Sequence, residues 1–404
     1  MPTDLPGELV ADDWVIVREF LPKGWEEQAR KTGAWRRSGR KLEGPDALLR
    51  ILMIHLAAGY SLKETATRAK QAGLGDLSSV AIHKRLLAAE EWLRWLAAKE
   101  RSLLVRKMPK VKRRLRAVDA TTISEPGSTG TDWRLHYAIN LTNLQCDFFE
   151  LTDVHGGETW RRVPVETGDV LLGDRIYSNP MGVAHVLRAG GDVLVRLNPH
   201  TLPLYDSDGG RVNVFRAVRG LKAGQHLDLP TWVKSASGEA FAGRLVALCR
   251  SAAATRREQR RLERKAGKQQ KKVSPQRLRL ARYLLIWTTL PSAHPATEIT
   301  EFYRWHWQVE LGFKRMKSIL GLGHLPKKDP GSARAWLHGK LLTSLLVERM
   351  IQAANTFSPW GYRSPPLPVA RGGIRLPRTV RRGRAPPRSR RHVLELDGNC
   401  SRSL

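Results

Sequence analysis

The chain has 404 residues, 41% of them hydrophobic, and its 69 Lys and Arg against 38 Asp and Glu give a formal net charge of +31. This composition excludes a disordered protein and is enough for two or three domains with real cores. The charge favours a polyanionic partner, with nucleic acid the leading candidate over a membrane surface. Because no apolar run reaches about 18 residues and no signal peptide or lipidation signal is found, we expect a soluble, cytoplasmic protein without a membrane partner.

The first 110 residues have a helical pattern. "GPDALLRILMIHLAAGYS" repeats apolar residues at helical spacing, and Ser61 followed by Glu64 forms a capping box at the start of the next helix. After "GLGD", the stretch "LSSVAIHKRLLAAEEWLRWLAAKE" predicts that two short helices joined by a Gly turn precede a longer one. This pattern fits a DNA-binding helix-turn-helix and an ordinary helical bundle equally well. The residues that would meet DNA in the first case are His83, Lys84 and Arg85.

Strand patterns begin near residue 111. "RLRAVDATTI" predicts one strand, and "WRLHYAINLT" with "QCDFFELTDV" predicts a hairpin around Thr142 and Asn143. After the partly helical "GGETWRRVPVETG", the segments "DVLLGDR", "NPMGVAHVLRAGG" and "DVLVRLN" predict a strand, a helix and a strand. The order β-β-β-α-β-α-β is that of a ribonuclease-H-like core, so the predicted fold class is α/β, with a mixed sheet covered by helices.

Residues 201–291 do not continue this order. We expect them to form a strand-rich basic insertion in a core that begins with residues 111–200 and is completed by residues 292–357. The insertion contains "RREQRRLERKAGKQQKKVSPQRLRLAR", with twelve Lys or Arg against two Glu. This stretch is either an arm that lies along phosphates or a solvated helix. The last segment, 358–404, has eleven Arg and seven Pro without periodicity, and we expect it to be disordered.

Two acidic residues come at the ends of apolar strands. Asp119 ends the run "RAV", and Asp174 ends the run "VLLG". If the two strands are neighbours in one sheet, both carboxylates emerge at the same edge and can share divalent cations, which prefer oxygen ligands. Either residue could instead be an ordinary turn residue at a strand end. The competing acids lie in or beside the predicted hairpin and are expected to face solvent: Asp132, Asp147, Glu150 and Asp153.

The stretch "YRWHWQVELGFKRMKS" predicts a helix with an unusual face. At about 100° per residue, that face carries a phenol, an imidazole, a carboxylate and two amines, namely Tyr303, His306, Glu310, Lys317 and, at the border, Lys314. A face meant only for water has no need of Tyr303, and one meant only for the core would not take Glu310. The pattern predicts a phosphate-and-metal site in which Glu310 completes a shell of three carboxylates. The remaining aromatic residues of the stretch, Trp305 and Trp307, are expected in the core.

These segments resemble a known family. "VDATT", "GGETWRR…GDVLLGDRIY" and "YRWHWQVELGFKRMKS" resemble the DDE transposases of the IS4 insertion-sequence family, and the likeness extends from about residue 45 to 350. The family signature is Tyr, two residues, Arg, three residues, Glu, six residues, Lys. The signature positions are occupied here by Tyr303, His306, Glu310 and Lys317. Position 306 is therefore His where the family usually has Arg, and His cannot hold a phosphate in a bidentate manner.

The resemblance implies a ribonuclease-H-like fold in which Asp119, Asp174 and Glu310 are the catalytic, metal-binding triad. It also implies that the cofactor is a pair of Mg²⁺ or Mn²⁺ ions. It implies that each transposon end is cut to leave a 3′ hydroxyl that attacks target DNA. The partner is then double-stranded DNA, and residues 1–110 are the DNA-binding domain. The protein is expected to bind DNA as a dimer and to associate with the bacterial nucleoid. An inactive DNA-binding relative and a nuclease without strand transfer are the alternatives. The residues assigned to phosphate contacts are Tyr303, His306, Lys314, Lys317 and Arg175.

Overall fold

The structure is a computed structural model that describes residues 13–36, 42–106, 113–268 and 270–356. The predicted disordered segment 358–404 lies outside the described residues. In the part of the chain that is described, no helix is long and apolar enough to cross a membrane.

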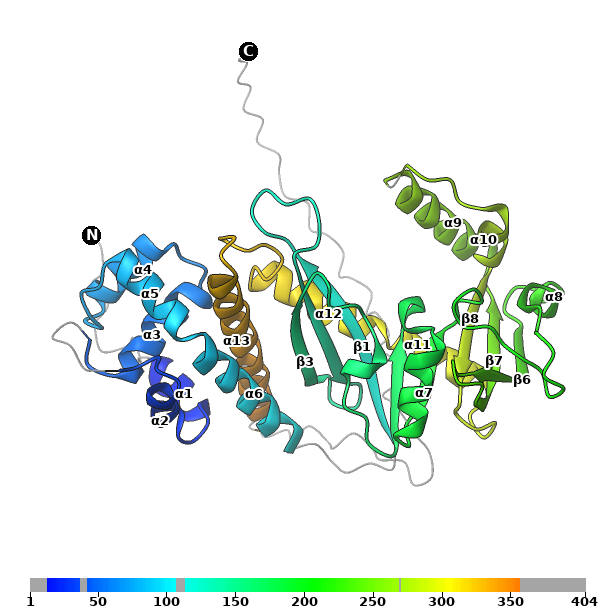
Figure 1. The fold of residues 1–404 in the computed structure, drawn as a ribbon, viewed down its shortest axis with the longest axis horizontal. Helices are drawn as coiled ribbons and strands as arrows, with labels where there is room; N and C mark the ends of the chain where they lie inside the picture. The colour runs from blue at the N-terminus through cyan, green and yellow to red at the C-terminus, as the bar shows by residue number, and fades with distance from the viewer. Residues whose placement is uncertain (1–12, 37–41, 107–112, 269, 357–404) are drawn as a thin grey trace, which may run out of the picture. The chain divides into compact units, whose positions relative to one another are not determined.

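Six helices make up the described part of the N-terminal region: α1 (Asp13–Phe20), α2 (Trp25–Lys31), α3 (Pro45–Leu56), α4 (Leu62–Gln71), α5 (Ser79–Ala88) and α6 (Glu90–Arg106). The predicted start of α4 is confirmed, because Ser61 Oγ accepts a hydrogen bond of 3.2 Å from Glu64 N. Ser78 caps α5 in the same way. Two short helices, α4 and α5, precede the longer α6, as the sequence predicts. Of these three, α5 and α6 pack against α13 (Pro330–Thr356), near the end of the described chain (Figure 1).

In the described residues, eight strands form one mixed sheet in the order β3-β2-β1-β4-β5-β8-β7-β6. Their bounds are β1 (Arg114–Ile123), β2 (Trp133–Asn140), β3 (Gln145–Asp153), β4 (Asp169–Gly173), β5 (Asp192–Arg196), β6 (His226–Lys234), β7 (Ala240–Cys249) and β8 (Tyr283–Thr288). β1, β2 and β3 form the antiparallel meander that the sequence predicts, and β4 and β5 run parallel to β1. This arrangement confirms the predicted α/β, ribonuclease-H-like fold.

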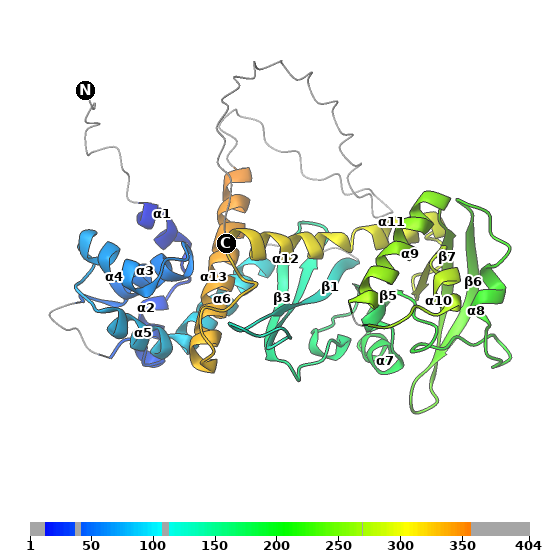
Figure 2. The same cartoon turned by 90° about the horizontal axis from the view of Figure 1, so that it is seen from above.

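The two faces of the sheet are covered by different helices. On one face, α7 (Pro180–Arg188) packs with the fully buried Trp160 of η1 (Trp160–Arg162) over apolar side chains of β1, β4 and β5. On the other face, α11 (Ala296–Arg304) and α12 (Trp307–Ile319) run across the strands, with α12 over β1 and β2 (Figure 2). Side chains alternate between the faces of a strand, so Val118 points into the α7 core while its neighbour Asp119 points to the α12 side.

The segment 201–291 adds to this sheet. It contributes β6, β7 and β8 together with α8 (Val214–Val218), α9 (Ala252–Gly267) and α10 (Pro275–Leu280). β8 pairs with β5 on one side and with β7 on the other, so the strands of this segment continue the core sheet. The basic helices α9 and α10 form an excursion between the paired strands β7 and β8 (Figure 1).

Candidate functional site

Register in the sheet brings Asp119 and Asp174 next to each other. β1 and β4 are parallel, and the last pair of their ladder is Ala117 with Leu172. Two residues further along both strands, the same register sets Asp119 beside Asp174, and neighbouring strands lie about 4.8 Å apart. The two residues are therefore adjacent, as expected, but only Asp174 lies at a strand end, directly after β4. The expectation that Asp119 ends its strand is wrong, because β1 continues to Ile123.

Packing against Trp160 fixes the turn that carries Asp174. A Cβ atom on Gly173 would lie 2.6 Å from Trp160 Cη2, so only glycine allows this close approach. Trp160 Nε1 donates a 2.9 Å hydrogen bond to the carbonyl oxygen of Tyr177. Asp174 Oδ1 accepts a 2.8 Å hydrogen bond from Ile176 N and opens the short helix η2 (Arg175–Tyr177).

The stretch that opens at Tyr303 is not one continuous helix. α11 ends at Arg304 and α12 begins at Trp307. Between them, backbone hydrogen bonds join residues three apart, from Trp305 N to Phe302 O and from His306 N to Tyr303 O. This short 3₁₀ turn separates Tyr303 from the helix that carries Glu310, so the prediction of a single helical face is wrong in this respect.

Two side chains bind α12 to β1 on either side of Glu310. His306 Nε2 donates to the carbonyl oxygen of Val118 at 3.1 Å, and Lys317 Nζ donates to the carbonyl oxygen of Thr122 at 3.0 Å. Glu310 is exposed between these two anchors. It opens, with Asp119, onto a shallow cavity of about 530 Å³. The residues that line the cavity are Asp119, Ala120, Thr121, Glu310, Phe313, Lys314, Lys317 and Ser318.

The electrostatics of Asp119 show that several carboxylates gather here. The pKa of Asp119 is raised to about 8, chiefly by burial and also by the negative charges of nearby acids, while a 2.8 Å hydrogen bond from Ala120 N lowers it. Those acids are Asp174, Glu158 and Glu310. Glu158, in the "GGETW" motif, was not singled out from the sequence, and Arg134 Nε lies 3.5 Å from its carboxylate. At neutral pH this pKa favours a proton on Asp119, which a bound divalent cation would displace.

The donor set suits a hard divalent cation, because Asp119, Asp174 and Glu310 supply carboxylate oxygens only. In the described residues, however, no group of three or more His, Cys, Asp or Glu side chains is arranged to hold a metal ion. Asp119 Oδ1 and Asp174 Oδ1 both accept hydrogen bonds from backbone amides of the following residues.

The residues assigned to phosphate contacts differ in exposure. Lys314 is exposed at the rim of the cavity, whereas Lys317 and Arg175 are half-buried. Tyr303 is half-buried, and burial raises its pKa to about 12, so its hydroxyl keeps its proton. His306 is only 4% exposed, and burial lowers its pKa. A buried, neutral imidazole bound to a main-chain carbonyl does not favour the phosphate contact expected of His306.

Two further expectations about burial are wrong. Trp307, expected in the core, is 51% exposed on the first turn of α12. Asp147, expected to face solvent, is buried and forms a bidentate pair with Arg116, at 2.8 and 2.9 Å. Arg116 also bonds Asp169 at 2.9 Å. These charges stabilise the sheet beneath the site and are not available to bind a cation.

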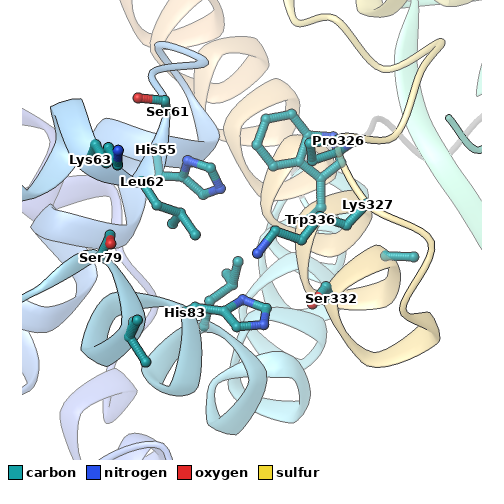
Figure 3. Close-up of a pocket in the computed structure, with 13 residues that line it drawn as sticks. His55, Ser61, Leu62, Lys63, Ser79, His83, Pro326, Lys327, Ser332 and Trp336 are labelled. Carbon is teal, nitrogen blue, oxygen red and sulfur yellow. The ribbon is translucent and has the colours of Figure 1, made fainter.

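A second cavity, of about 410 Å³, lies between α4, α5 and the start of α13 (Figure 3). It shares no lining residue with the carboxylate cavity. Of the three residues predicted to meet DNA, His83 lines this cavity and the guanidinium of Arg85 lies 5.4 Å from the ring centre of Trp35. Lys84 is the exposed residue of the three. The structure does not test the helix-turn-helix interpretation, which stays a prediction.

Comparisons with known proteins identify the family of the chain. The family model described as "Transposase DDE domain" matches residues 110–346. The chain is 30% identical over 359 residues to the putative transposase InsL for insertion sequence element IS186A of Escherichia coli K12, covering 86% of this chain and 96% of that protein. It is also 30% identical over 360 residues to the transposase for insertion sequence element IS421 of Escherichia coli, with the same coverage.

A solved structure of piggyBac transposase in a synaptic complex with hairpin DNA has a TM-score of 0.45 and 8% identity, over 84% of this chain and 73% of that one. This similarity is too low to add to the fold assignment. The family match defines the class of protein as a DNA transposase, an enzyme that transfers polynucleotide strands. The chain belongs to the DDE transposases of the IS4 insertion-sequence family.

Proposed function

We propose that this transposase works by cut-and-paste. It binds the terminal inverted repeats of its own insertion sequence, cuts each end to leave a 3′ hydroxyl, and joins that end to target DNA. The observation that carries this proposal is the juxtaposition of Asp119 and Asp174 by strand register, with Glu310 held on α12 beside Asp119.

The three carboxylates would hold two Mg²⁺ or Mn²⁺ ions. When bound, such ions stabilise negative charge on the attacking and leaving oxygens of a phosphodiester. Asp119 and Asp174 sit on the rigid sheet, while Glu310 approaches from the helix that His306 and Lys317 attach to β1. A rigid support of this kind keeps catalytic groups within the small tolerance that such chemistry allows.

Cations around the carboxylates hold the DNA backbone in this proposal. Lys314 and Lys317 lie at the cavity beside Glu310, and Arg175 follows Asp174 directly. The protonated hydroxyl of Tyr303 donates a hydrogen bond to a phosphate oxygen. His306 has a positioning role, because its ring is committed to Val118.

The N-terminal region, residues 1–110, supplies recognition of the transposon end. Lys84 is exposed on α5, which a helix-turn-helix would place in the major groove. A dimer assembled on two paired ends, in the cytoplasm of a bacterium and associated with the nucleoid, completes the proposal.

A cleavage and joining assay tests the reaction. Labelled DNA carrying the element's own terminal repeats is incubated with wild type or with Asp119→Ala, in Mg²⁺ or Mn²⁺. We expect 3′-hydroxyl ends and joined products with wild type alone. Equal products with both proteins would refute the enzymatic role of Asp119 and favour an inactive DNA-binding relative, whereas cut ends that never join would identify a nuclease.

A further inference from the structure

The second cavity, of about 410 Å³, lies where three helices begin, namely α4, α5 and α13 (Figure 3). The residues that the first turns of these helices place at the cavity are Leu62, Lys63, Ser79, Val80, Ser332 and Ala333. The backbone N–H groups and the dipole of a helix give its start a partial positive charge. Three such starts around one cavity favour a negatively charged group inside it.

Two lysines add full charges to these partial charges. Lys63 and Lys327 are exposed at the cavity, and the described residues that line it include no Asp or Glu. Figure 3 shows the amine of Lys327 reaching between the rings of His55 and His83, and the charges of Lys327 and His83 both act on His55. Within the described chain, neither lysine amine forms a hydrogen bond or an ion pair. Both charges are therefore left for a ligand.

Two buried polar atoms of the cavity wall lack a partner among the described residues. Trp336 lines the cavity and is 6% exposed, and its Nε1 atom is buried without an acceptor. His83 Nδ1 is likewise buried without a partner. Asp329, on which the charge of His83 acts, already accepts a 2.7 Å hydrogen bond from Ser332 N. Because buried polar groups are normally paired, these atoms indicate a ligand that offers hydrogen-bond acceptors.

The rest of the wall is largely apolar and is held in place. Leu86 of α5 lines it, as does Pro326 of the segment 320–329 that joins α12 to α13. This segment is tied to the end of β1, because Ser124 N donates to Gly323 O at 3.3 Å and Leu325 N donates to Ser124 O at 3.0 Å. A pre-formed apolar cavity of about 300–1,000 Å³ with a few polar groups is typical of a site for a small organic ligand.

We propose that this cavity binds a single nucleotide, with its phosphate on Lys63, Lys327 and the helix starts and its base against Trp336 and the apolar wall. A nucleotide combines an anion with a flat ring whose carbonyl oxygens and ring nitrogens accept hydrogen bonds from a donor such as Trp336 Nε1. A base inside a duplex cannot enter a cavity, so the nucleotide is either free or unpaired in bound DNA. The choice of a nucleotide rests on the proposed function, in which residues 1–110 bind DNA.

DNA binding in EDTA, which needs no cleavage, tests the first source of the nucleotide. Terminal-repeat duplexes that carry one bulged nucleotide, moved one position at a time, are compared with the fully paired duplex by fluorescence anisotropy. We expect one position to bind about tenfold more tightly, equal to about 1.4 kcal/mol, because the protein no longer has to unpair that nucleotide. Val80→Trp, which fills the cavity from an exposed position, and Lys327→Gln should abolish this preference.

Mononucleotides test the second source. The DNA-free protein and the same two variants are titrated with dAMP, dCMP, dGMP and dTMP by isothermal titration calorimetry. Binding to wild type that both variants weaken about tenfold or more would identify a free nucleotide as the ligand. A bulge preference that both variants lose would identify an unpaired nucleotide of bound DNA.

Two matched variants control for charge and for size. Lys328→Gln removes the same charge from the next residue, which is exposed and does not line the cavity. Val15→Trp places the same bulky side chain at a helical position that is 59% exposed, against 61% for Val80. Both controls should keep the bulge preference and the mononucleotide binding of wild type.

The proposal is overturned if wild type shows neither the bulge preference nor mononucleotide binding, or if the cavity variants keep what wild type shows. All four changed side chains are exposed, so Tm should match that of wild type. Cavity variants that lose binding only together with a lowered Tm would show a role in the fold and would also overturn it. A protein that binds the nucleotide but cuts no DNA would refute the proposed function and leave the nucleotide site standing.

Discussion

His306 Nε2 lies 3.1 Å from the carbonyl oxygen of Val118, the residue that precedes Asp119 in β1. This hydrogen bond joins the turn between α11 and α12 to the strand at the point where the strand carries its carboxylate. The turn ends α11 and begins α12, so His306, together with Lys317 further along α12, sets the approach of Glu310 to the sheet. The imidazole is buried and keeps no charge, because burial lowers its pKa.

Replacing His306 should therefore affect stability and catalysis together. His306→Ala leaves the buried carbonyl of Val118 without its donor, at a cost of about 1–3 kcal/mol. His306→Arg restores the usual family residue but requires a guanidinium to be buried, so we expect a larger loss of Tm. Thermal unfolding and cleavage of terminal-repeat DNA measure both effects. An Arg variant that is as stable as wild type and cuts faster would contradict the positioning role.

We expect mutation to distinguish the roles of Lys314 and Lys317, although both residues lie on α12. Lys314 is exposed, so Lys314→Ala should leave Tm unchanged and reduce the slope of log K against log salt by about 1. Lys317 donates to Thr122, so Lys317→Ala should also lower Tm. Salt titrations of DNA binding and thermal scans give the comparison. Equal thermal losses in the two variants would contradict the anchoring role of Lys317.

A methyl group at Gly173 should displace Asp174. The added Cβ would meet Trp160 at 2.6 Å, and overpacking of this kind costs about 1–3 kcal/mol. We expect Gly173→Ala to lower Tm and to abolish cleavage. Gly157→Ala is the matched control, because an added Cβ there meets no atom within 4 Å. If Gly173→Ala cuts DNA at the wild-type rate, close packing on Trp160 is not what positions Asp174.

Glu348 should make stability depend on pH. Its oxygens accept hydrogen bonds from Tyr137 Oη and Cys146 N, each at 3.1 Å, and burial raises its pKa to about 7. The folded pKa of Glu348 exceeds its usual value of 4.5, so the protonated carboxyl contributes to the free energy of unfolding. This contribution is complete below about pH 4.5 and is lost as pH rises through 7. The Tm of Glu348→Gln relative to wild type should therefore increase between pH 4.5 and 8. Parallel Tm curves for the two proteins would contradict this.

The order of the first five strands along the chain and the place of Asp119 and Asp174 after apolar runs could be predicted from the sequence, because both depend on local patterns. An apolar run that ends in an acid is visible in a few consecutive residues. The break in the helix after Arg304 was not visible, since Trp305 and His306 keep right-handed helical backbone angles and leave the apolar periodicity almost intact. Only the change from i+4 to i+3 hydrogen bonding marks the turn.

Partners that are far apart in the sequence could not be predicted. Asp147 looks solvent-facing in its hairpin until Arg116, 31 residues earlier, is placed against it. The contact between Arg196 and Glu258 likewise joins the end of β5 to a helix 62 residues later. Glu158 lies two residues before Trp160, which packs against Gly173, and this was the one weak indication of its position in the sequence. Only the folded chain shows that the charge of Glu158 acts on Asp119.

The excursion that contains α9 and α10 begins and ends at adjacent positions. Cys249 and Tyr283 are cross-strand partners in the β7–β8 ladder, and Arg250 N donates to Arg282 O at 2.8 Å. The chain thus leaves and re-enters the sheet at one point, as a long loop on an ordinary hairpin does. A change in the length of these two cationic helices consequently need not alter the order of the strands that carry the acids.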